Sequence, residues 1–573
     1  MTPDLTCDVL ILGSGGAGLL AALRAVRRNP RLRVVLASKG LVGKSGCTRM
    51  VQGGYNAVLD PGDSLDLHLE DTLKGGQFIN NQDLACTLVN GAPAMVQELE
   101  TTIGCFFDRR DDGRIHQKPF AGQSFDRTVH RGDLTGIEIV GRLRDALYAT
   151  DVTVLEEARA LDVVRSPDGW RIAGAVLLDA RRGQFVRVQA NLTILATGGG
   201  ARMYRVAAPS LEKTGDGIAM AWRAGATLVD MEMYQFHPTG LLAGASRMTG
   251  MVLEEGLRGV GGILRNAAGE RFMQRYDPVR MERSTRDVVA RSGYLEIMAG
   301  RGTPQGGVYI DVSHLGADAV QRMFPGMVAR CLDFGYDLRS GPVEVSPTAH
   351  FHMGGVKIDA RCHSSLPGLL AAGEDSGGTH GANRLGGNGV AESTVFGAIA
   401  GDVAAEEALD MGRCVLDAEH VETIERTALR PLEQPGSEDP FELRTRLEDL
   451  MWENVGLVRS QSSLVDALED ISELRERALS TSVPNFRRLN LAWTEALDLV
   501  NLLQVAELVT RSALERRESR GAHYRSDFPA ADDARWLRNV FLQRETDGTP
   551  RVWDEPVQFK YMRPPGVAAA VPA

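Results

Sequence analysis

Four short segments of the chain each place a histidine or an arginine beside glycine, proline or an acid. They read FHPTG, TRDVVARS, HFHMGG and GANRLGGNG, and they supply His237, Arg286, His350 and Arg384. Arginine presents a planar fork of donors that matches a carboxylate, and histidine can add further hydrogen bonds. Because functional residues concentrate on loops held by a rigid scaffold, we interpret the four as one site rather than as separate surface residues. The set is suited to binding a small dianion.

The composition limits the classes of protein to which the chain can belong. Its 573 residues exceed what one hydrophobic core supports, which predicts several domains. An apolar content of 43% and a charged content of 24% are typical of globular proteins. The net charge of -11 argues against nucleic-acid binding, which requires a basic surface. An anionic substrate must therefore meet a local cluster of arginines.

The sequence also bears on membranes, compartment and metals. No run of 18 or more apolar residues exists, so we expect no membrane-spanning segment. The beginning, MTPDLTCDVLILGSGG, lacks a basic region and a cleavage site, which favours a cytoplasmic protein. The seven cysteines form no CxxC pair, so we expect neither a disulfide framework nor a metal site. If the chain passes electrons to a metal relay, that relay belongs to another subunit.

The N-terminal segment CDVLILGSGGAGLLAALRAV predicts a buried strand, a glycine turn and a helix. Gly13, Gly15 and Gly18 have the GxGxxG spacing of a dinucleotide fold, in which the pyrophosphate rests on the helix N-terminus. The next apolar strand, LRVVLAS, follows at the spacing of a βαβ unit. It ends in Ser38 and Lys39, where such folds commonly carry an acid for the ribose. This difference argues against a simple NAD site.

Further glycine loops follow this unit. GKSGCTRMVQGGYNAVL can lay backbone donors along a flavin ring or ribityl chain, and NLTILATGGGARMY is another strand that runs into glycines. The strand, glycine loop and helix pattern returns at residues 367–401. Nucleotide-binding segments thus lie at both ends of the first 400 residues. We therefore predict an α/β fold in which a discontinuous Rossmann-like domain carries an insertion.

The chain resembles the flavoprotein subunits of succinate dehydrogenase and fumarate reductase, with L-aspartate oxidase as a near relative. The resemblance extends from GSGGAG through VQGGYNAV, DDGRIHQKPFAGQS, ATGG, TGDGIAMA, FHPTG, RDVVARS, HFHMGG and GANRLGG to ESRGAHYRSDFP. It implies an FAD-binding domain in two parts, an inserted α+β capping domain, a helical bundle and a C-terminal extension. The implied ranges are 1–232 and 347–406 for FAD binding, 233–346 for the cap, 407–530 for the helices and 531–573 for the extension.

The resemblance also implies the residues around FAD. Glu374 can accept hydrogen bonds from ribityl hydroxyls, and a helix beginning after Asn388 can turn its positive end toward a reduced, anionic flavin. The implied cofactor-binding set is Gly13, Ser14, Gly15, Gly16, Ala17, Gly18, Ser38, Lys39, Ser45, Cys47, Thr48, Gln52, Gly53, Gly54, Ala160, Thr197, Gly198, Asp216, Glu374, Arg384 and Asn388.

The family pattern assigns the chemistry as well. It makes His237, His350 and Arg384 the holders of the two carboxylates of a four-carbon diacid. Arg286 matches the residue that exchanges a proton with a substrate carbon while the flavin exchanges a hydride. Since an arginine pKa lies above 12, Arg286 can act only beside other cations and coupled to a relay.

The relay positions match Glu255 and Arg258, which lie three residues apart and can pair on one helix face. Without the resemblance, an ordinary salt bridge would be the preferred interpretation of that pair. Phe120 is implied to pack against substrate and flavin. Phe120 to Gln123 occupy a region where aspartate oxidases usually carry an acid for the substrate ammonium, which favours a dicarboxylate without an amine.

Two positions differ from the family pattern. Cys47 stands where classical members attach FAD covalently through a histidine, so we predict noncovalent FAD; a thioether to Cys47 is the alternative. A noncovalent flavin in this family generally favours fumarate reduction. Glu254 stands where a threonine helps to hold a substrate carboxylate, and an ionised Glu254 4 Å from that carboxylate would repel it by about 4 kcal/mol at an effective dielectric of 20. Glu254 must therefore point away, be protonated or mark a changed substrate.

From about residue 407 the sequence changes to charged stretches with apolar residues at helical spacing, such as DPFELRTRLEDLMWENVGLV. They predict a helical bundle, followed by a tail with one short strand and a proline-ended extension. In the family this subunit binds an iron-sulfur subunit, which connects to a membrane anchor and quinone. We therefore expect a peripheral subunit on the cytoplasmic side of the membrane that interconverts succinate and fumarate. A soluble L-aspartate oxidase and a non-catalytic flavin-binding module are the alternatives.

Overall fold

The predicted first strand and its neighbours form the parallel core of a seven-stranded sheet. A computed structural model describes residues 2–246 and 248–566. The parallel strands, in spatial order, are β6 (Thr153–Glu156), β2 (Val34–Ser38), β1 (Leu5–Leu12), β9 (Gln184–Leu195) and β16 (Leu369–Ala371). β8 (Ile172–Asp179) and β7 (Ala158–Arg165) extend β9 in antiparallel fashion. Because β16 comes from beyond residue 350 yet pairs with β9, the domain is discontinuous and the predicted α/β class is correct.

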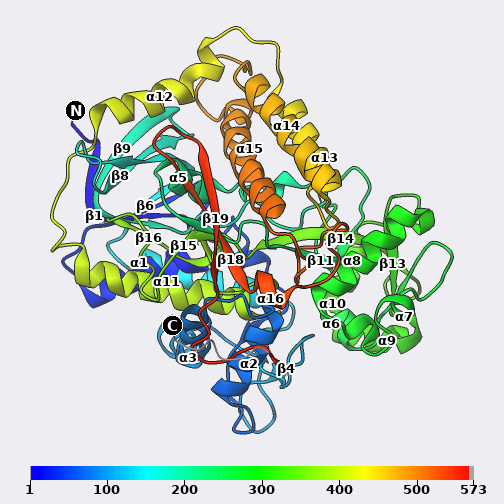
Figure 1. The fold of residues 1–573 in the computed structure, drawn as a ribbon. Coiled ribbons are helices and arrows are strands. Elements are labelled where there is room, and N and C mark those ends of the chain that lie inside the picture. The colour runs from blue at the N-terminus through cyan, green and yellow to red at the C-terminus, as the bar shows by residue number, and fades with distance from the viewer. Residues whose placement is uncertain (1, 247, 567–573) are drawn as a thin grey trace.

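Helices α1 (Gly16–Arg28) and α11 (Asn388–Glu407) pack against each other beside this sheet (Figure 1). The glycine turn before α1 is sterically required. Gly13 has a φ of 111°, and a Cβ added to Gly18 would lie 2.0 Å from the Gly13 carbonyl oxygen. The turn thus brings the helix N-terminus close to the carboxyl ends of β1 and β9, where ligands bind in open α/β sheets.

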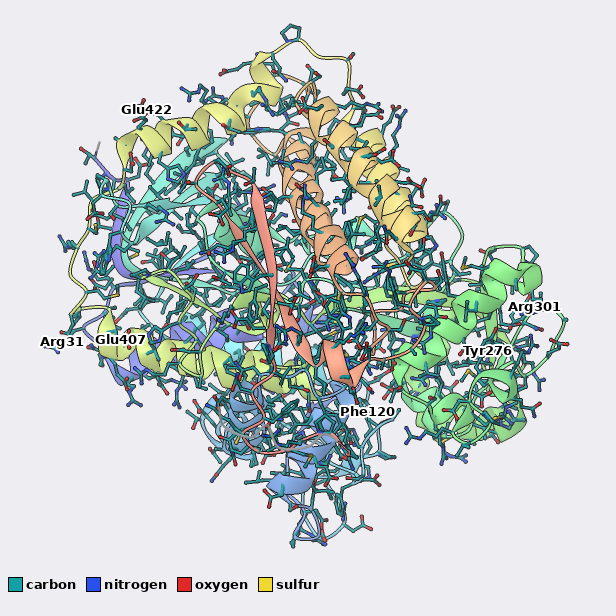
Figure 2. The ribbon with its side chains drawn as sticks, viewed as in Figure 1. Arg31, Phe120, Tyr276, Arg301, Glu407 and Glu422 are labelled. Atoms are coloured by element: carbon teal, nitrogen blue, oxygen red, sulfur yellow. The ribbon has the colours of Figure 1, made fainter. Side chains whose placement is uncertain are left out.

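A second lobe has its own hydrophobic core, built from residues between Leu241 and Val345 (green in Figure 1). Tyr276 and Arg301 lie there and both contact the buried Glu296 (Figure 2). Its sheet runs in the order β11 (Tyr234–Leu241), β14 (Val343–His352), β13 (Val308–Asp311) and β12 (Ile263–Arg265), and its helices are α6 (Gly256–Gly259), α7 (Met273–Tyr276), α8 (Arg286–Glu296), α9 (Ala317–Met323) and α10 (Pro325–Leu332). A separate core supports a separate capping domain; the boundaries at 233 and 346 remain predictions.

Residues 55–148 contain a small sheet and three α-helices. The elements are β3 (Tyr55–Asn56), β4 (Gln117–Lys118), β5 (Thr128–Val129), α2 (Leu65–Gly75), α3 (Gln82–Glu98) and α4 (Thr135–Tyr148). β5 is the central strand, with β3 and β4 on its two sides. The segment from β4 to β5 carries Phe120, which lies near the junction with the green lobe in Figure 2.

The C-terminal part contains the expected helices. They are α12 (Ala418–Glu433), α13 (Pro440–Asn454), α14 (Gln461–Ala478) and α15 (Leu491–Glu515), and α15 also contacts α5 (Asp216–Arg223). No helix of the described ranges is long and apolar enough to cross a membrane.

The tail differs from the single strand that the sequence predicts. It forms a hairpin of β18 (Arg538–Arg544) and β19 (Pro550–Pro556), preceded by α16 (Asp533–Trp536). β18 pairs with β10 (Leu228–Val229), which also pairs with β15 (Gly355–Lys357), the neighbour of β17 (Ser376–Gly377). The expected proline-ended tail falls partly in residues 567–573, outside the described ranges.

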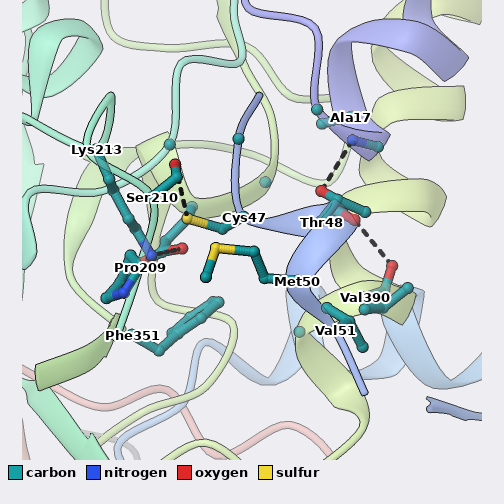
Figure 3. Close-up of a pocket in the computed structure, with 18 of the residues that line it drawn as sticks. Ala17, Cys47, Thr48, Met50, Val51, Pro209, Ser210, Lys213, Phe351 and Val390 are labelled. Carbon is teal, nitrogen blue, oxygen red and sulfur yellow. Dashed lines mark hydrogen bonds and ion pairs between the residues drawn. The ribbon is translucent and has the colours of Figure 1, made fainter. Parts of the chain in front are cut away.

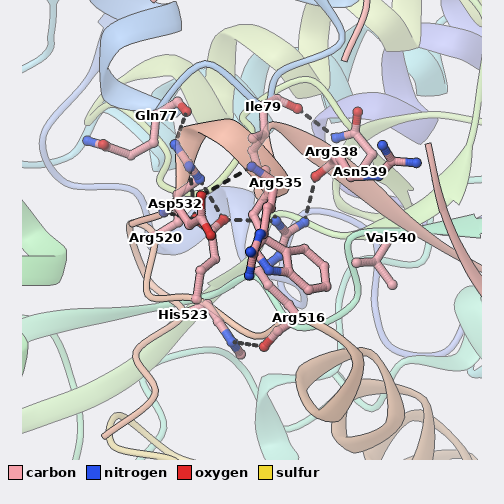
Figure 4. Close-up of polar contacts among 12 residues, drawn as sticks. Gln77, Ile79, Arg516, Arg520, His523, Asp532, Arg535, Arg538, Asn539 and Val540 are labelled. Carbon is pink, nitrogen blue, oxygen red and sulfur yellow. Dashed lines mark hydrogen bonds and ion pairs between the residues drawn. The ribbon is translucent and has the colours of Figure 1, made fainter. Parts of the chain in front are cut away.

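A buried ionic cluster joins this tail to the segment that leads into β11. Arg516 is fully buried, and its Nε donates to Glu232 Oε1 at 2.5 Å while its Nη1 donates to Glu518 Oε1 at 3.1 Å. Arg520 donates to Glu518 as well, at 2.7 Å (Figure 4). Because unpaired buried charges are strongly destabilising, this cluster fixes the tail against the rest of the molecule.

Candidate active site

One cavity contains nearly all the residues that the sequence singles out. It extends from the glycine turn before α1 and past the loop around Cys47, both near labelled residues of Figure 3, to the lobe that carries His237. Its lining includes Gly13, Ser14, Gly15, Gly16, Ala17, Ser38, Lys39, Ser45, Cys47, Thr48, Gln52, Gly53, Gly54, Phe120, Ala160, Thr197, Gly198, Asp216, His237, Glu255, Arg286, His350, Glu374 and Arg384. The nucleotide-type loops and the four basic residues thus meet in one space.

Three predicted residues do not line the cavity. Gly18 lies beneath the turn, where it allows the close approach to Gly13. Arg258 lies behind Glu255 and is fully buried. The Asn388 amide is occupied elsewhere, since its oxygen accepts from Asn56 Nδ2 at 2.7 Å and its nitrogen donates to Thr72 Oγ1 at 3.0 Å. The side chain of Asn388 therefore serves the packing of α11, which begins at this residue rather than after it.

The end of the cavity near α1 fits a dinucleotide. N-cap residue Gly15 has no side-chain cap, so the first turn of α1 presents backbone donors to a phosphate. Thr48 Oγ1 accepts from Gly16 N at 3.0 Å and fixes the glycine-rich loop beside the helix (Figure 3). Ser14 and Ser38 hydroxyls are 2.7 Å apart at the ends of β1 and β2. No acid follows β2, in agreement with the sequence.

Lys39 forms ion pairs with two buried aspartates in this region. Its Nζ lies 3.1 Å from Asp216 Oδ2 and 2.5 Å from Asp498 Oδ1, and Arg159 Nη1 donates to the same Asp498 oxygen at 2.8 Å. Two cations and two carboxylates therefore balance each other between α5 and α15.

The two predicted histidines face each other from adjacent strands. His237 is on β11 and His350 is on β14, and their ring centroids are 5.5 Å apart. Burial, together with the neighbouring arginines, lowers the pKa of both rings well below the usual histidine range. Thr239 N donates to His237 Nδ1 at 3.3 Å, so Nε2 of the neutral ring carries the proton. His237 can therefore donate a hydrogen bond without contributing charge.

Arg286 begins α8 and forms a close ion pair with Glu255, which precedes α6. Its Nη2 and Nε donate to Glu255 Oε2 at 2.5 and 2.9 Å. The other carboxylate oxygen of Glu255 accepts from Arg258 Nη2 at 3.1 Å. Burial alone would raise the pKa of Glu255, but Arg286 and Arg258 outweigh it and lower that pKa. A continuous chain of charged groups thus runs from the cavity wall into the lobe.

Gln235, which sequence reasoning missed, joins Arg286 to Arg384. Its side-chain oxygen accepts from Arg286 Nη1 and from Arg384 Nη2, both at 3.1 Å. Its amide nitrogen donates to Asn383 Oδ1 and Arg384 O, both at 2.8 Å, which fixes the orientation of the amide. Gln235 lies two residues before His237 on the same strand. Because side chains two residues apart on a strand point to the same face, the position of His237 could have indicated that Gln235 also belongs to the site.

Arg384 is the cation of the cavity with the fewest partners. Its guanidinium stacks on Phe351 with 4.5 Å between the guanidinium carbon and the ring centroid, and its Nε has no hydrogen-bond partner among the described residues. Burial, and then the charge of Arg286, lowers the pKa of Arg384 to about 9. A buried guanidinium without a carboxylate partner is suited to receive one from a ligand.

The buried charges at this end of the cavity do not cancel. Glu255 and Gln235 join Arg258, Arg286 and Arg384 into one hydrogen-bonded group, and its three positive charges and one negative charge leave a surplus of two within the group. Two neutral histidines add donors without adding charge. The surplus matches a dianion with two carboxylates, as the sequence predicts.

Glu254 lines the cavity and is paired with a lysine. Its Oε1 lies 2.6 Å from Nζ of Lys118, at the end of β4, while the glutamate is only 4% exposed. Of the possibilities open at the sequence level, the structure supports a fourth one, a glutamate neutralised by a neighbouring cation. Lys118 lies two residues before Phe120, but only the fold brings it to Glu254.

Lys213 is a further residue that the sequence did not single out. It lines the cavity, forms an ion pair with Glu374 and donates to the His350 carbonyl oxygen at 3.3 Å. Cys47 lies nearby with its sulfur 3.7 Å from the Ser210 hydroxyl, and Figure 3 shows both facing the space beside Met50. The adjacent TGDG motif could have drawn attention to Lys213.

Comparison with known families matches both halves of the chain. Residues 8–390 match the family described as FAD binding domain, and residues 444–569 match the family described as fumarate reductase flavoprotein C-term.

Individual relatives match over nearly the whole length. The chain is 46% identical to one of the subunits of the CoM/CoB fumarate reductase of Methanothermobacter marburgensis, over 94% of this chain and 98% of that protein. It is 37% identical to the 8-methylmenaquinol:fumarate reductase flavoprotein subunit of Wolinella succinogenes, over 97% and 92%. Among solved structures, a mutant of E. coli quinol fumarate reductase FrdA aligns over 98% of both chains with a TM-score of 0.93 and 33% identity.

The pH dependence of dianion binding tests the roles of these cations. The affinity for malonate should stay constant between pH 7 and 8, because the buried histidines are neutral there. It should fall above about pH 9, by up to tenfold per pH unit, as free Arg384 loses its proton. Calorimetric titration with malonate measures this. Replacing Arg384 by lysine should move the decline to lower pH, and a decline centred near pH 6.5 in the unchanged protein would contradict the assignment.

Proposed function

Since the chain belongs to the fumarate reductase flavoprotein family and is a flavin-dependent oxidoreductase with an FAD-binding domain, we propose that it interconverts succinate and fumarate. The observation that carries this proposal is the surplus of two buried positive charges in and directly behind the wall of the cavity that also holds the dinucleotide-type loops. A C4-dicarboxylate supplies two matching negative charges.

In this proposal His237, His350 and Arg384 hold the two carboxylates. Arg384 provides charge and paired donors, and the neutral rings provide directed hydrogen bonds. Phe120, which is 9% exposed and directly beside Gly53, excludes water from one side of the cavity. Gln235 sets the spacing between Arg384 and Arg286 through its shared oxygen.

Arg286 exchanges the proton with the substrate carbon. The ion pair with Glu255 at 2.5 Å gives Arg286 a partner that can take or return a proton, and Arg258 continues the route from the other Glu255 oxygen. Positioned proton transfer contributes about 10²–10⁴-fold to enzymatic rates. When bound, FAD supplies the hydride acceptor or donor.

The residues around the cofactor favour noncovalent FAD. The glycine turn at α1, Thr48 and the Lys213–Glu374 pair would hold it. Cys47 is partly exposed in the cavity wall and hydrogen bonds with Ser210. The contact of the Cys47 thiol with the Ser210 hydroxyl supports retention of FAD by contacts alone.

A partner subunit is the remaining part of the proposal. The name of one relative includes CoM/CoB, and the name of another includes 8-methylmenaquinol. We propose that an iron-sulfur subunit receives or delivers the electrons and connects through a membrane anchor to quinone, with this chain on the cytoplasmic face. We propose a binding patch near the flavin end, made of apolar side chains that are exposed at and beside α4, because exposed apolar side chains that gather on a surface often mark partner sites.

That patch follows the outer face of α4. Phe106, Leu134, Ile137 and Tyr148 are exposed there, and Phe106 N donates to Glu138 at 2.9 Å. The inner side of α4 contacts the cofactor loop, since Gly136 N donates to the Val51 carbonyl oxygen at 2.9 Å. A partner protein on this face would lie next to the loop that lines the cavity.

An aspartate oxidase is a second candidate function because of one observation. Glu254 has one carboxylate oxygen without a hydrogen-bond partner in the described ranges, and such an oxygen could accept from an ammonium. The pairing with Lys118 and the absence of an acid from Phe120 to Gln123 favour the dicarboxylate without an amine. Assays with aspartate and with succinate separate the two, and iminoaspartate formation alone would favour the oxidase.

Replacing Arg286 tests the catalytic proposal. Arg286→Gln and Arg286→Lys should lower kcat for fumarate reduction by about 10³-fold or more, because the proton carrier is lost, while FAD content stays unchanged. The exposed Arg280→Gln variant is the matched control and should keep full activity. Substantial turnover by both Arg286 variants would refute the assignment.

Acid precipitation tests the attachment of FAD. Trichloroacetic acid should release yellow FAD into the supernatant from the unchanged protein and from a Cys47→Ala variant equally. Flavin fluorescence that stays on the denatured chain, and disappears in Cys47→Ala, would instead establish a thioether.

Copurification from membranes tests the partner. The native complex should contain an iron-sulfur subunit, and Ile137→Glu should weaken its retention at least tenfold because a charge enters an apolar contact. Val279→Glu changes another exposed aliphatic residue, 88% exposed in the other lobe, and should have no effect. Retention of the iron-sulfur subunit by Ile137→Glu would rule out this surface.

A further inference from the structure

The pair of Lys118 and Glu254 joins two parts of the chain at the substrate end of the cavity. The two residues are 136 positions apart, one at the end of β4 and one in the segment before α6. Glu254 lines the cavity, whereas Lys118 lies behind it with a side chain that is 19% exposed. Lys118 Nζ also lies 3.4 Å from the Gly132 carbonyl oxygen and 6.0 Å from the Phe120 ring centroid.

Lys118 is the cation that neutralises Glu254. Glu255, the adjacent acid, has two arginine partners, and Glu374 has Lys213. Across residues 2–246 and 248–566, no cation other than Lys118 lies within ion-pairing distance of Glu254. Arg330 also faces this segment, but its Nη1 is directed to the Val252 carbonyl oxygen at 3.5 Å.

The charge balance of the cavity depends on this pair. Without Lys118, the carboxylate of Glu254 would reduce the surplus of two positive charges to one. An unpaired carboxylate in the cavity wall repels an anionic ligand group beside it. With Lys118 the pair contributes no net charge, and the surplus again equals the charge of a dicarboxylate.

We propose that Lys118 is a positioning and specificity-determining residue, which makes the cavity selective for dianions by neutralising Glu254. It acts through Glu254 and does not contact the substrate. The inference rests on the proposed function, since it concerns the same dicarboxylate site. The ion pair allows an anionic substrate to bind beside a wall that carries the carboxylate of Glu254.

Binding to the flavin-loaded protein tests the inference without relying on turnover. The probes are malonate, a dianion, and monomethyl succinate, a monoanion, each titrated at pH 7 while the flavin absorbance is recorded. Lys118→Met should raise the dissociation constant of malonate at least tenfold and change that of monomethyl succinate several-fold less. If Lys118 only supported the local structure, Lys118→Met would raise the dissociation constants of both ligands by the same factor.

A second substitution distinguishes charge from folding. In the double variant Lys118→Met with Glu254→Gln, the carboxylate is gone as well, so the malonate affinity should return to within about threefold of the unchanged protein. The control Lys74→Met removes a lysine from a surface pair with Glu70, where the two atoms are 2.5 Å apart, and should change neither affinity.

The outcomes separate this inference from the proposed function. If the unchanged protein bound neither malonate nor fumarate, the proposed function would fail. If it bound malonate and Lys118→Met bound it equally well, or if the double variant stayed as weak as the single one, the role of Lys118 would be refuted while the proposed function would stand.

Discussion

A surplus of positive charge in a buried place is the constraint on which the site depends. Arg258, Arg286 and Arg384 are all at most 8% exposed, and only Glu255 among the contacting groups opposes them. Uncompensated buried charge is costly, so the surrounding protein must hold these groups against mutual repulsion. The carbonyl oxygen of Gln235 and the ring of Phe351 do this by contacting guanidinium groups without adding charge. When a dianion enters, its two negative charges relieve the repulsion among the arginines, and this relief contributes to the binding free energy.

The fold places this surplus at the meeting point of four segments that are separate in the sequence. β11 and β14 bring the histidines and Gln235, the turn before α11 brings Arg384, and α8 begins at Arg286. β16 returns the chain to the central sheet after the second lobe, so that Glu374 reaches the cofactor end. Because the lobe is an insertion between two sheet strands, substrate groups and cofactor groups are supplied by different cores yet share one cavity.

Much of this arrangement was visible in the sequence because the relevant residues stand in glycine-rich segments. His237, His350, Arg384 and the loop around Cys47 were predicted together, and the structure places them in one cavity. Lys118 and Lys213 were not predicted, since their partners lie 136 and 161 residues away and no local pattern reveals either pairing. For Asn388 the sequence indicated the backbone position, at the start of a helix, but not the contacts of the side chain. That side chain forms hydrogen bonds with Asn56 and Thr72. Local patterns indicate backbone geometry, whereas long-range pairing decides which side chains face the cavity.

The C-terminal hairpin also has a consequence for the order in which the protein matures during synthesis. Glu232, two residues before β11, is neutralised by Arg516, and β10 pairs with β18. Domains generally fold in the order in which the ribosome releases them. Here the strand that carries Gln235 and His237 is flanked by a buried acid whose counter-ion emerges almost 300 residues later. A nascent chain can therefore build the glycine turn early, but it cannot complete the substrate end of the cavity until its last segments leave the ribosome.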